Sequence, residues 1–295
     1  MGVILAKTAG FCYGVERAVE LAKQTAAGGG CVMLGSIIHN AAVVQELEAL
    51  GARTVDDVSQ IQPGETVVIR SHGEPVETYR ALEEKGARIV DATCPNVARI
   101  HQLVAKAEAE GRTPLIIGEA HHPEVLAAAS RSPHSVILEG PEELEKWLAE
   151  RPERREMPLL AVAQTTCIQT IWQNAQKILK KECTNAEIFD TICLATHKRQ
   201  TEAAELAAKV DVMVVVGDRK SANTKHLTEI SRLRCPTVYQ IEGVEELNVD
   251  FLKGCSVAGL TAGASTPAGI IKEVYATMSE EIKNMEATEE SFEEM

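Results

Sequence analysis

Three cysteines with similar neighbours are the residues of this chain best suited to chemistry. Cys12, Cys94 and Cys193 each follow a short apolar or β-branched run, precede a helix-like stretch and open roughly one third of the sequence. Brought to one point, three thiolates would bind a soft metal centre and would leave one position open for a substrate. We therefore predict that the thirds are structural repeats, each carrying one cysteine.

The residues leave the kind of metal centre open. The three cysteines lack the Cys-x-x-Cys pairs that are usual in structural zinc sites. An iron–sulfur cluster usually takes four cysteines, so three would leave one iron able to act as a Lewis acid. Spacing favours a cluster over zinc without excluding zinc. The other five cysteines are interpreted as small buried hydrophobic residues: Cys31, Cys167, Cys183, Cys235 and Cys255.

Short β-branched runs alternate with amphipathic stretches along the chain, which predicts an α/β fold with small parallel sheets. Strands are expected at residues 3–8, 31–34, 67–70, 88–90, 115–117, 159–163, 187–189, 212–216 and 256–258. A helix at 268–282 is expected to pack back onto the first lobe. The expected domains are lobes at residues 1–95, 96–190 and 191–267, followed by an acidic tail or truncated linker at 283–295.

Polar loops follow the predicted strands at corresponding points of the three repeats. Because the carboxyl ends of parallel strands face one edge of a sheet, these loops are placed where ligands bind. Their Ser, Thr, Asn and His donors, together with helix N-termini, could hold a phosphate group. The loop residues are His39, Asn40, Ser71, His72, Gly73, His121, His122, Glu124, Thr165, Thr166, Ser221, Asn223, Ser265 and Thr266.

Glu124 is the one carboxylate of this set that directly follows a His-Pro pair. It lies in the first turn of a predicted helix, where a negative charge complements the helix dipole. It could equally serve as a proton donor near the metal centre. The sequence leaves both roles open.

Composition and charge argue against a nucleic-acid surface and against a membrane-spanning helix. The chain has 295 residues and a net charge of −13, without the basic patch that a nucleic-acid surface needs. No apolar run reaches the ~18 residues of a membrane helix, and the N-terminal residues do not form a signal peptide. We expect a cytoplasmic protein whose eight cysteines are reduced.

An ordered set of motifs resembles the (E)-4-hydroxy-3-methylbut-2-enyl diphosphate reductase family of the non-mevalonate isoprenoid pathway. The resemblance covers about residues 1–280. It rests on Gly10-Phe-Cys12-Tyr-Gly-Val-Glu-Arg-Ala, Ile38-His39-Asn40, Ser71-His72-Gly73, Asp91-Ala-Thr-Cys94-Pro, His122-Pro-Glu124, Gln164-Thr-Thr166, Asp190-Thr-Ile-Cys193-Leu-Ala-Thr and Thr261-Ala-Gly-Ala-Ser265.

The resemblance implies a three-lobed, pseudo-threefold α/β fold around a central [4Fe–4S] cluster. It implies that Cys12, Cys94 and Cys193 are the ligands and that Glu124 delivers protons. The chain departs from the family at Ala222, where a serine is common, so one hydroxyl donor to the diphosphate is missing. The substrate-binding positions that it implies are His39, His72, His122, Thr165, Thr166, Ser221, Ala222, Asn223 and Ser265.

The resemblance also implies a reaction, a two-electron reductive dehydroxylation that gives isopentenyl and dimethylallyl diphosphates. The chain has no Gly-x-Gly-x-x-Gly fingerprint for a dinucleotide, so ferredoxin or flavodoxin is the expected electron donor. Two alternatives are a redox-neutral iron–sulfur hydro-lyase and a non-enzymatic metal or redox sensor. Some family members continue into S1-type RNA-binding repeats, and we expect a nucleic-acid partner only with such an extension.

Overall fold

The polypeptide forms three small parallel sheets with helices packed on them. The structure is a computed structural model that describes residues 2–252 and 255–293, with side chains to residue 284. The described part holds twelve strands and ten α-helices, and each sheet has four parallel strands. The predicted α/β class with small parallel sheets is confirmed. None of the described helices is long and apolar enough to cross a membrane.

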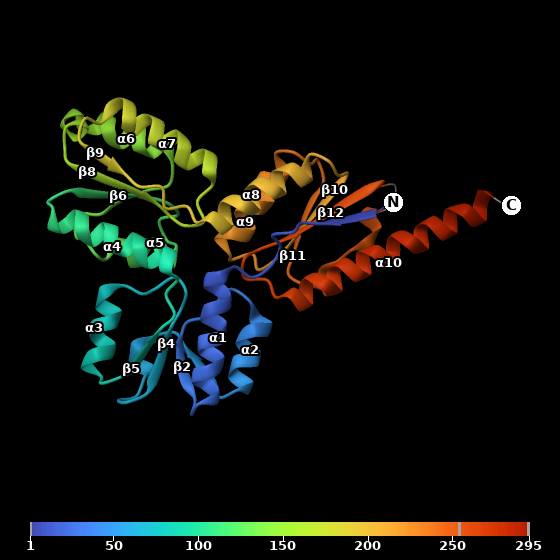
Figure 1. Ribbon diagram of the computed structural model, residues 1–295, viewed down its shortest axis with the longest axis horizontal. Helices are drawn as coiled ribbons and strands as arrows, with labels where there is room; N and C mark the ends of the chain where they lie inside the picture. Colours follow the sequence, from blue (N-terminus) through green and yellow to red (C-terminus); the bar gives the residue numbers. More distant parts are fainter. Residues whose placement is uncertain (1, 253–254, 294–295) are drawn as a thin grey trace. The chain divides into compact units, whose positions relative to one another are not determined.

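Strands and helices alternate along nearly the whole chain (Figure 1). The strands are β1 (Gly2–Leu5), β2 (Cys31–Leu34), β3 (Ala52–Val55), β4 (Thr66–Ile69), β5 (Arg88–Asp91), β6 (Thr113–Ile117), β7 (Val136–Leu138), β8 (Leu159–Ala163), β9 (Ala186–Ile188), β10 (Val212–Val216), β11 (Val238–Ile241) and β12 (Val257–Ala262). The helices are α1 (Tyr13–Ala27), α2 (Ala41–Ala49), α3 (Val76–Glu84), α4 (Pro95–Ala109), α5 (Pro123–Ala129), α6 (Pro141–Glu150), α7 (Gln169–Glu182), α8 (Leu194–Ala207), α9 (Ala222–Arg232) and α10 (Ala268–Glu293).

The chain divides into two compact units. One consists of residues 1–12 and 194–295 and contains the sheet β11-β10-β12-β1. The other consists of residues 13–193 and contains two sheets, β3-β2-β4-β5 and β7-β6-β8-β9. All three sheets therefore share one strand order, which is the structural repeat that the cysteine spacing predicts.

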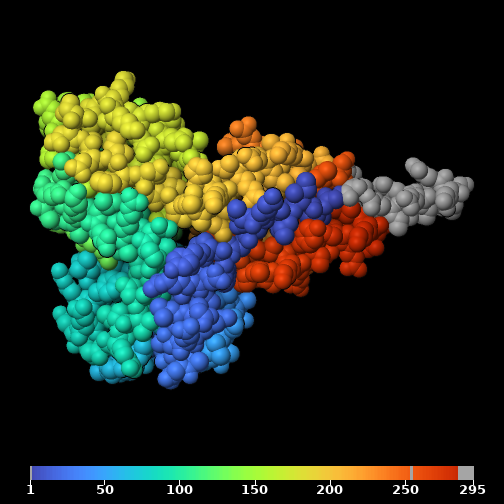
Figure 2. All heavy atoms as spheres, in the orientation of Figure 1, coloured from blue at the N-terminus to red at the C-terminus, as the bar shows by residue number. Residues whose placement is uncertain are grey.

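The N-terminal strand corrects the expected boundary of the first lobe. We expected residues 1–95 to form one lobe, but β1 pairs in parallel with β12, with Gly2 opposite Val257 and Leu5 opposite Leu260. Figure 2 shows this first segment, in blue, lying along the orange and red C-terminal part. Strand periodicity shows that a segment is a strand but cannot show which sheet it joins, and that is the physical reason for the difference.

The last helix packs on the sheet that contains β1. The helix expected at 268–282 is α10, which packs beside β1 and against the core of β10 and β12 through Ile271, Val274 and Met278. The expected packing onto the first lobe is therefore correct only for β1, which itself belongs to the C-terminal sheet. It continues to Glu293, so part of the expected tail is helical. The expected tail residues 294 and 295, and the side chains from 285 onward, lie outside the described part of the chain.

Central strands are buried on both faces because helices cover both sides of the sheets. In the sheet around β8, Trp172 and Leu179 of α7 pack on one face, together with Leu144 of α6. On the other face, Val104 of α4 and Val125 of α5 pack against the same sheet. Continuous apolar runs such as Leu-Leu-Ala-Val-Ala in β8 are typical of strands buried in this way.

Candidate active site

Each of the three cysteines follows the strand that takes the equivalent place in its sheet. Cys94 follows β5, Cys193 follows β9 and Cys12 follows β1, and each of these strands takes the last place in the order of its sheet. A helix begins at the next residue in every case. The three cysteines therefore occupy equivalent positions, each between the last strand of a sheet and the start of a helix.

A backbone hydrogen bond ties each cysteine to the polar loop after the neighbouring strand. The amide of Cys94 donates to the carbonyl of Ser71 over 3.0 Å, and the amide of Cys193 donates to that of Thr165 over 3.1 Å. In the other unit the amide of Cys12 donates to the carbonyl of Ala264 over 3.3 Å. Cysteine and donor loop therefore form one local assembly in each of the three sheets.

The donor chemistry of these cysteines fits a metal cluster. All three are partly exposed, whereas Cys31, Cys167 and Cys235 are buried, as expected for structural residues. The same expectation is wrong for Cys183 and Cys255, which are partly exposed, so exposure alone does not distinguish the proposed ligands. Burial raises the pKa of the Cys167 thiol to about 12, which keeps it protonated. Within the described residues no group of three or more His, Cys, Asp or Glu side chains is arranged to hold a single metal ion.

Gly14 provides room for the sulfur of Cys94. A Cβ atom at Gly14 would lie 2.6 Å from Cys94 Sγ and 3.1 Å from its Cβ. Such distances are shorter than van der Waals contact, so a side chain there would displace the thiol. This glycine, in the first turn of α1, is a site feature that its residue type alone does not indicate.

Replacing Gly14 by alanine is expected to lower the free energy of unfolding by about 1–3 kcal/mol, because overpacking outweighs the better helix propensity of alanine. Gly269 is a matched control, because it also lies at the start of a helix and a Cβ there would meet nothing within 4 Å. Gly269→Ala is expected to leave stability unchanged or to increase it. Thermal unfolding of both variants checks this, and equal midpoints would contradict the role of Gly14.

Three histidines of the second unit lie together. The ring centroids of His39 and His72 are 5.6 Å apart, and those of His72 and His122 are 5.2 Å apart with the rings edge to face. Burial, followed by the nearby His122, His39 and Arg70, holds the pKa of His72 well below its usual value, so His72 is neutral at pH 7. The donors predicted from separate loops are thus brought into one cluster.

His122 and Glu124 are positioned by the start of α5. His122 precedes the helix, and its Nδ1 accepts a hydrogen bond from the amide of Glu124 over 3.1 Å. An accepting Nδ1 leaves the proton of a neutral imidazole on Nε2. Pro123 occupies the first helical position, where its missing N–H costs nothing. The His-Pro-Glu sequence therefore fixes both the tautomer of His122 and the place of Glu124.

The carboxyl group of Glu124 is buried and held by Thr165. Glu124 is 2% exposed, its Oε1 accepts from the Thr165 amide over 2.6 Å, and its Oε2 accepts from the Thr165 hydroxyl over 2.7 Å. Burial raises the pKa of Glu124, while the two hydrogen bonds from Thr165 oppose that rise. A buried acid with a raised pKa can carry a proton at a pH where an exposed glutamate cannot.

Gln164 is a further contributor, which sequence reasoning treated only as part of a motif. It is 1% exposed, its Oε1 accepts from the amide of Glu119 over 3.0 Å, and its Nε2 donates to Thr166 Oγ1 over 3.0 Å. It thereby joins the loop after β6 to the loop after β8. Its place directly before the two threonines was the signal that could have identified it.

The remaining donors lie in the first unit, after two neighbouring strands. Ser221 caps α9, and its Oγ accepts from the Thr224 amide over 3.4 Å. Ala222 begins the helix and is buried, as is Asn223. Ser265 follows β12, which pairs with β10, the strand that precedes Ser221. The two loops therefore leave the same edge of one sheet.

Three of the predicted donors carry buried polar atoms without a hydrogen-bond partner in the described residues: His72 Nδ1, Asn223 Nδ2 and Ser265 Oγ. A buried polar group left unpaired costs about 1–3 kcal/mol. An oxygen atom of a bound ligand would satisfy His72 in the second unit, and would likewise satisfy Asn223 or Ser265 in the first unit. This supports the interpretation of these residues as donors to an anionic group.

A buried acid and unpaired buried donors at strand ends are features typical of enzymes that act on small molecules. Residues 3–279 match the family described as LytB protein, and the chain belongs to that family. A relative from Caldanaerobacter subterraneus, named 4-hydroxy-3-methylbut-2-enyl diphosphate reductase, is 36% identical over 99% of this chain and 100% of its own. A relative of the same name from Anaeromyxobacter is 39% identical over 93% of this chain and 95% of its own.

Solved structures agree with this assignment. The E-1-hydroxy-2-methyl-but-2-enyl-4-diphosphate reductase from Plasmodium falciparum superposes with a TM-score of 0.88 at 27% identity, over 94% of this chain and 87% of that one. A structure of (E)-4-hydroxy-3-methyl-but-2-enyl diphosphate reductase, described as the terminal enzyme of the non-mevalonate pathway, superposes with a TM-score of 0.67 at 35% identity. It covers 95% of this chain and 100% of that one.

Proposed function

We propose that this chain is a 4-hydroxy-3-methylbut-2-enyl diphosphate reductase, an oxidoreductase of the non-mevalonate isoprenoid pathway. It removes the hydroxyl group of its substrate as water and gives isopentenyl and dimethylallyl diphosphates, with two electrons and two protons consumed per turnover. The observation that carries the proposal is the near full-length similarity to relatives of that name. Those relatives support neither the hydro-lyase nor the sensor.

Cys12, Cys94 and Cys193 are proposed to hold a [4Fe–4S] cluster. Their support is their equivalent placement, each before a helix and each bonded through its amide to a donor loop. The bound cluster would supply the two electrons, one at a time, and a Lewis-acidic iron for the leaving oxygen. Gly14 keeps space for the sulfur of Cys94.

The diphosphate is proposed to bind through donors from all three lobes. His72 offers a neutral imidazole N–H group with His122 beside it, and Asn223 and Ser265 offer unpaired buried atoms. Neutral donors suit this role because they do not repel one another while no anion is bound. The proposed substrate-binding set is His39, His72, His122, Thr165, Thr166, Ser221, Ala222, Asn223 and Ser265.

Glu124 is proposed to deliver the proton that turns the departing hydroxyl group into water. Its support is burial, a raised pKa and a fixed orientation on Thr165. The Thr165 hydroxyl donates to one carboxyl oxygen and so keeps the group from rotating. Thr166, held by Gln164, stands in the same segment and extends the polar wall.

The electron donor is proposed to be a small redox protein such as ferredoxin or flavodoxin, and the enzyme is proposed to work in the cytoplasm. The support is the absence of a dinucleotide fingerprint in the sequence and the eight free cysteines. Nothing in the acidic composition favours a nucleic-acid partner, which is proposed only for a chain with an S1-type extension.

The decisive experiment is an anaerobic turnover assay with (E)-4-hydroxy-3-methylbut-2-enyl diphosphate and a low-potential reductant. We expect both diphosphate products, in amounts limited by the electrons supplied. The control omits the reductant, where a reductase gives no product. Turnover without reductant would instead identify a redox-neutral hydro-lyase, and no turnover by the cluster-loaded protein would reject the proposal.

Replacing Ala222 by serine is expected to strengthen substrate binding, since a hydroxyl would be added at the start of α9 beside Asn223. A hydrogen bond to a charged group predicts a KM lower by about threefold to tenfold with kcat little changed. Ala268→Ser, at the first residue of α10, is the matched control. An unchanged KM for Ala222→Ser would mean that the missing hydroxyl group is not needed.

A further inference from the structure

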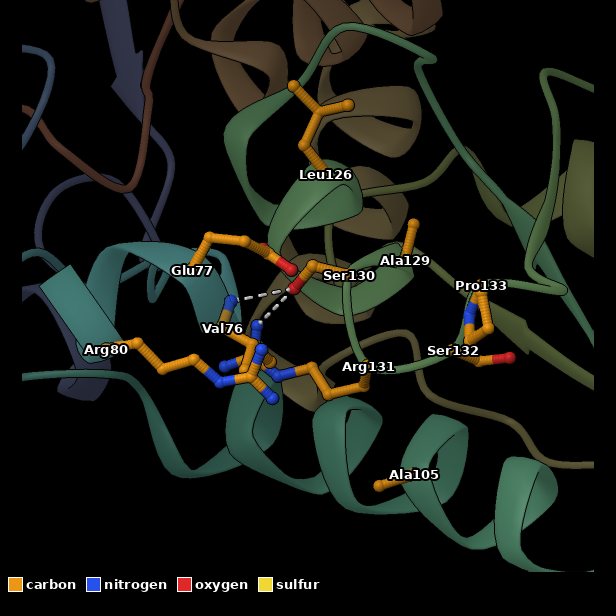
Figure 3. Close-up of a pocket in the computed structure, with 10 residues that line it drawn as sticks. All are labelled: Val76, Glu77, Arg80, Ala105, Leu126, Ala129, Ser130, Arg131, Ser132 and Pro133. Carbon is orange, nitrogen blue, oxygen red and sulfur yellow. Dashed lines mark hydrogen bonds between the residues drawn. The ribbon is translucent and has the colours of Figure 1, made fainter.

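A groove in the second unit lies apart from the residues assigned to the reaction. It has a volume of about 720 Å³ and is bounded by α3, α4, α5 and the residues that follow α5 (Figure 3). Pockets for small molecules typically measure about 300–1,000 Å³. The groove is thus large enough for an organic ligand, and it has room beyond a bare phosphate ion.

Two arginines give the groove a positive wall. Arg80 on α3 and Arg131 after α5 extend toward each other from opposite sides in Figure 3. Neither takes part in a salt bridge in the part of the chain that the structure describes. Burial lowers the pKa of Arg131, and the nearby Tyr79, Asp91 and Glu77 oppose that change, whereas Arg80 is exposed. Arg80 is therefore the more available of the two guanidinium groups for binding phosphate or carboxylate oxygens.

Arg131 is held in place, which makes it a fixed element of the wall. Its Nη1 donates to the carbonyl of Glu74 over 2.7 Å, to the hydroxyl of Ser130 over 3.0 Å and to the carbonyl of Ala127. The Ser130 hydroxyl oxygen also accepts from the amide of Val76, over 3.1 Å. These bonds fix α3 against the end of α5, so the guanidinium group does not have to be ordered when a ligand binds.

The rest of the groove is largely apolar. Leu126 is 44% exposed, and Ala105 and Ala129 lie with it along α4 and α5. Glu77 is the one carboxylate among the lining residues. It offsets one of the two positive charges, so the groove favours an anion of low charge over a highly charged one.

We propose that this groove binds an amphipathic anion, an alkyl or alkenyl phosphate whose head lies between Arg80 and Arg131 and whose hydrocarbon chain covers Leu126 and Ala129. The two arginines would bind the charged head group, and the apolar side chains of the groove would contact the hydrocarbon chain of the ligand. Neither an inorganic anion nor an uncharged hydrocarbon would satisfy both parts. The inference does not depend on the proposed reductase activity.

The test is calorimetric titration of the full chain with octyl phosphate, below its micelle concentration, and with inorganic phosphate. We expect octyl phosphate to bind at least about tenfold more tightly than inorganic phosphate, because burying the chain adds roughly 0.8 kcal/mol per CH₂. Arg80→Met is expected to lower the affinity for octyl phosphate about tenfold. Arg80 is exposed and has no hydrogen bond or salt bridge among the described residues, so this variant is expected to fold.

Two further variants test the charged and the apolar residues of the groove separately. Glu77→Gln is expected to increase the affinity for octyl phosphate about twofold to fivefold, since it removes a carboxylate that repels the anionic head group. Leu126→Ala is expected to weaken octyl phosphate about threefold to tenfold while inorganic phosphate is unaffected. Arg234→Met, an exposed arginine at the end of α9 that does not line the groove, is the control and is expected to bind like the unmodified chain.

Equal affinities for octyl phosphate in Arg80→Met and Arg234→Met would overturn the proposal, because they would place the binding elsewhere on the chain. Equal affinities for octyl phosphate and inorganic phosphate would overturn it as well, since the apolar floor would then contribute nothing. Absence of octyl phosphate binding up to millimolar concentration would have the same consequence.

Discussion

Replacing Cys193 by serine is expected to remove the bound iron and to abolish turnover. A serine oxygen is a hard ligand and replaces a soft thiolate poorly at iron–sulfur centres. Changes even outside the ligand shell of a metal commonly cost about 10–100-fold in affinity or activity, so loss of a ligand is expected to exceed a hundredfold. Iron content, visible absorbance and anaerobic turnover measure the three consequences.

The matched control is Cys183→Ser. Cys183 is also partly exposed and lies in the same unit, but it packs against the apolar core around β8 and follows no edge strand. This variant is expected to keep its iron and its turnover. If Cys193→Ser retained full iron and activity, the three-cysteine proposal would fail, while the family membership would stand.

The buried strands and the helices between them were accessible from the sequence. The predicted strands at 31–34, 159–163 and 212–216 have the bounds found in the structure. These segments are continuous apolar runs of four or five residues that are buried on both faces, and their shortness favours a strand over a helix.

The strands that sequence reasoning missed occupy one equivalent position. β3, β7 and β11 are the edge strands beside β2, β6 and β10. Each has at most four residues and is only partly buried, as in Ala-Arg-Thr-Val of β3. A short edge strand is fixed by its pairing with a neighbour rather than by an apolar pattern. Apolar patterns therefore fail to indicate the equivalent edge strand in all three sheets for the same reason.

The placement of β1 shows a second limit. Its Gly-Val-Ile-Leu sequence indicates a strand, but only the pairing with β12 assigns it to the sheet of the C-terminal residues. The repeat is consequently shifted along the chain. Each cysteine follows the last strand of one sheet and precedes the first helix of the next repeat, whereas we had expected it to open one third of the chain.

For the candidate site, loop positions were predictable and contacts were not. Strand ends and donor residue types located His72, His122 and Thr165, because the carboxyl edge of a parallel sheet is where loops meet. The bonds between Thr165 and Glu124, and between Gln164 and the loop before α5, join residues about forty positions apart. Such distant pairings depend on packing that no local pattern describes.

Glu124→Gln is expected to bind substrate normally and to lose most turnover. The amide keeps the size of the side chain and can still accept from Thr165, but it cannot supply a proton. Loss of a general acid typically costs about 10²–10⁴-fold, and we expect the fall in kcat with KM changed less than about threefold. Iron content is expected to stay at the level of the unmodified enzyme.

Glu142→Gln separates this role from helix stabilisation. Glu142 follows Pro141 in the first turn of α6, as Glu124 follows Pro123 in α5, but it is exposed. Both variants lose the same interaction with a helix dipole, worth about 0.3–1 kcal/mol. Only Glu124→Gln is expected to lower kcat, and similar turnover in the two variants would remove Glu124 as the proton source.

The pH profile gives an independent readout of the same carboxyl group. Burial raises the pKa of Glu124, and the protonated form is the one that donates. The rate in the unmodified enzyme should therefore fall as the pH rises through that raised pKa, whereas a group with an ordinary glutamate pKa would already be deprotonated at lower pH. Glu124→Gln is expected to lose this decline while retaining its low rate, because glutamine does not titrate. A decline at the same pH in Glu124→Gln would assign the titration to another group.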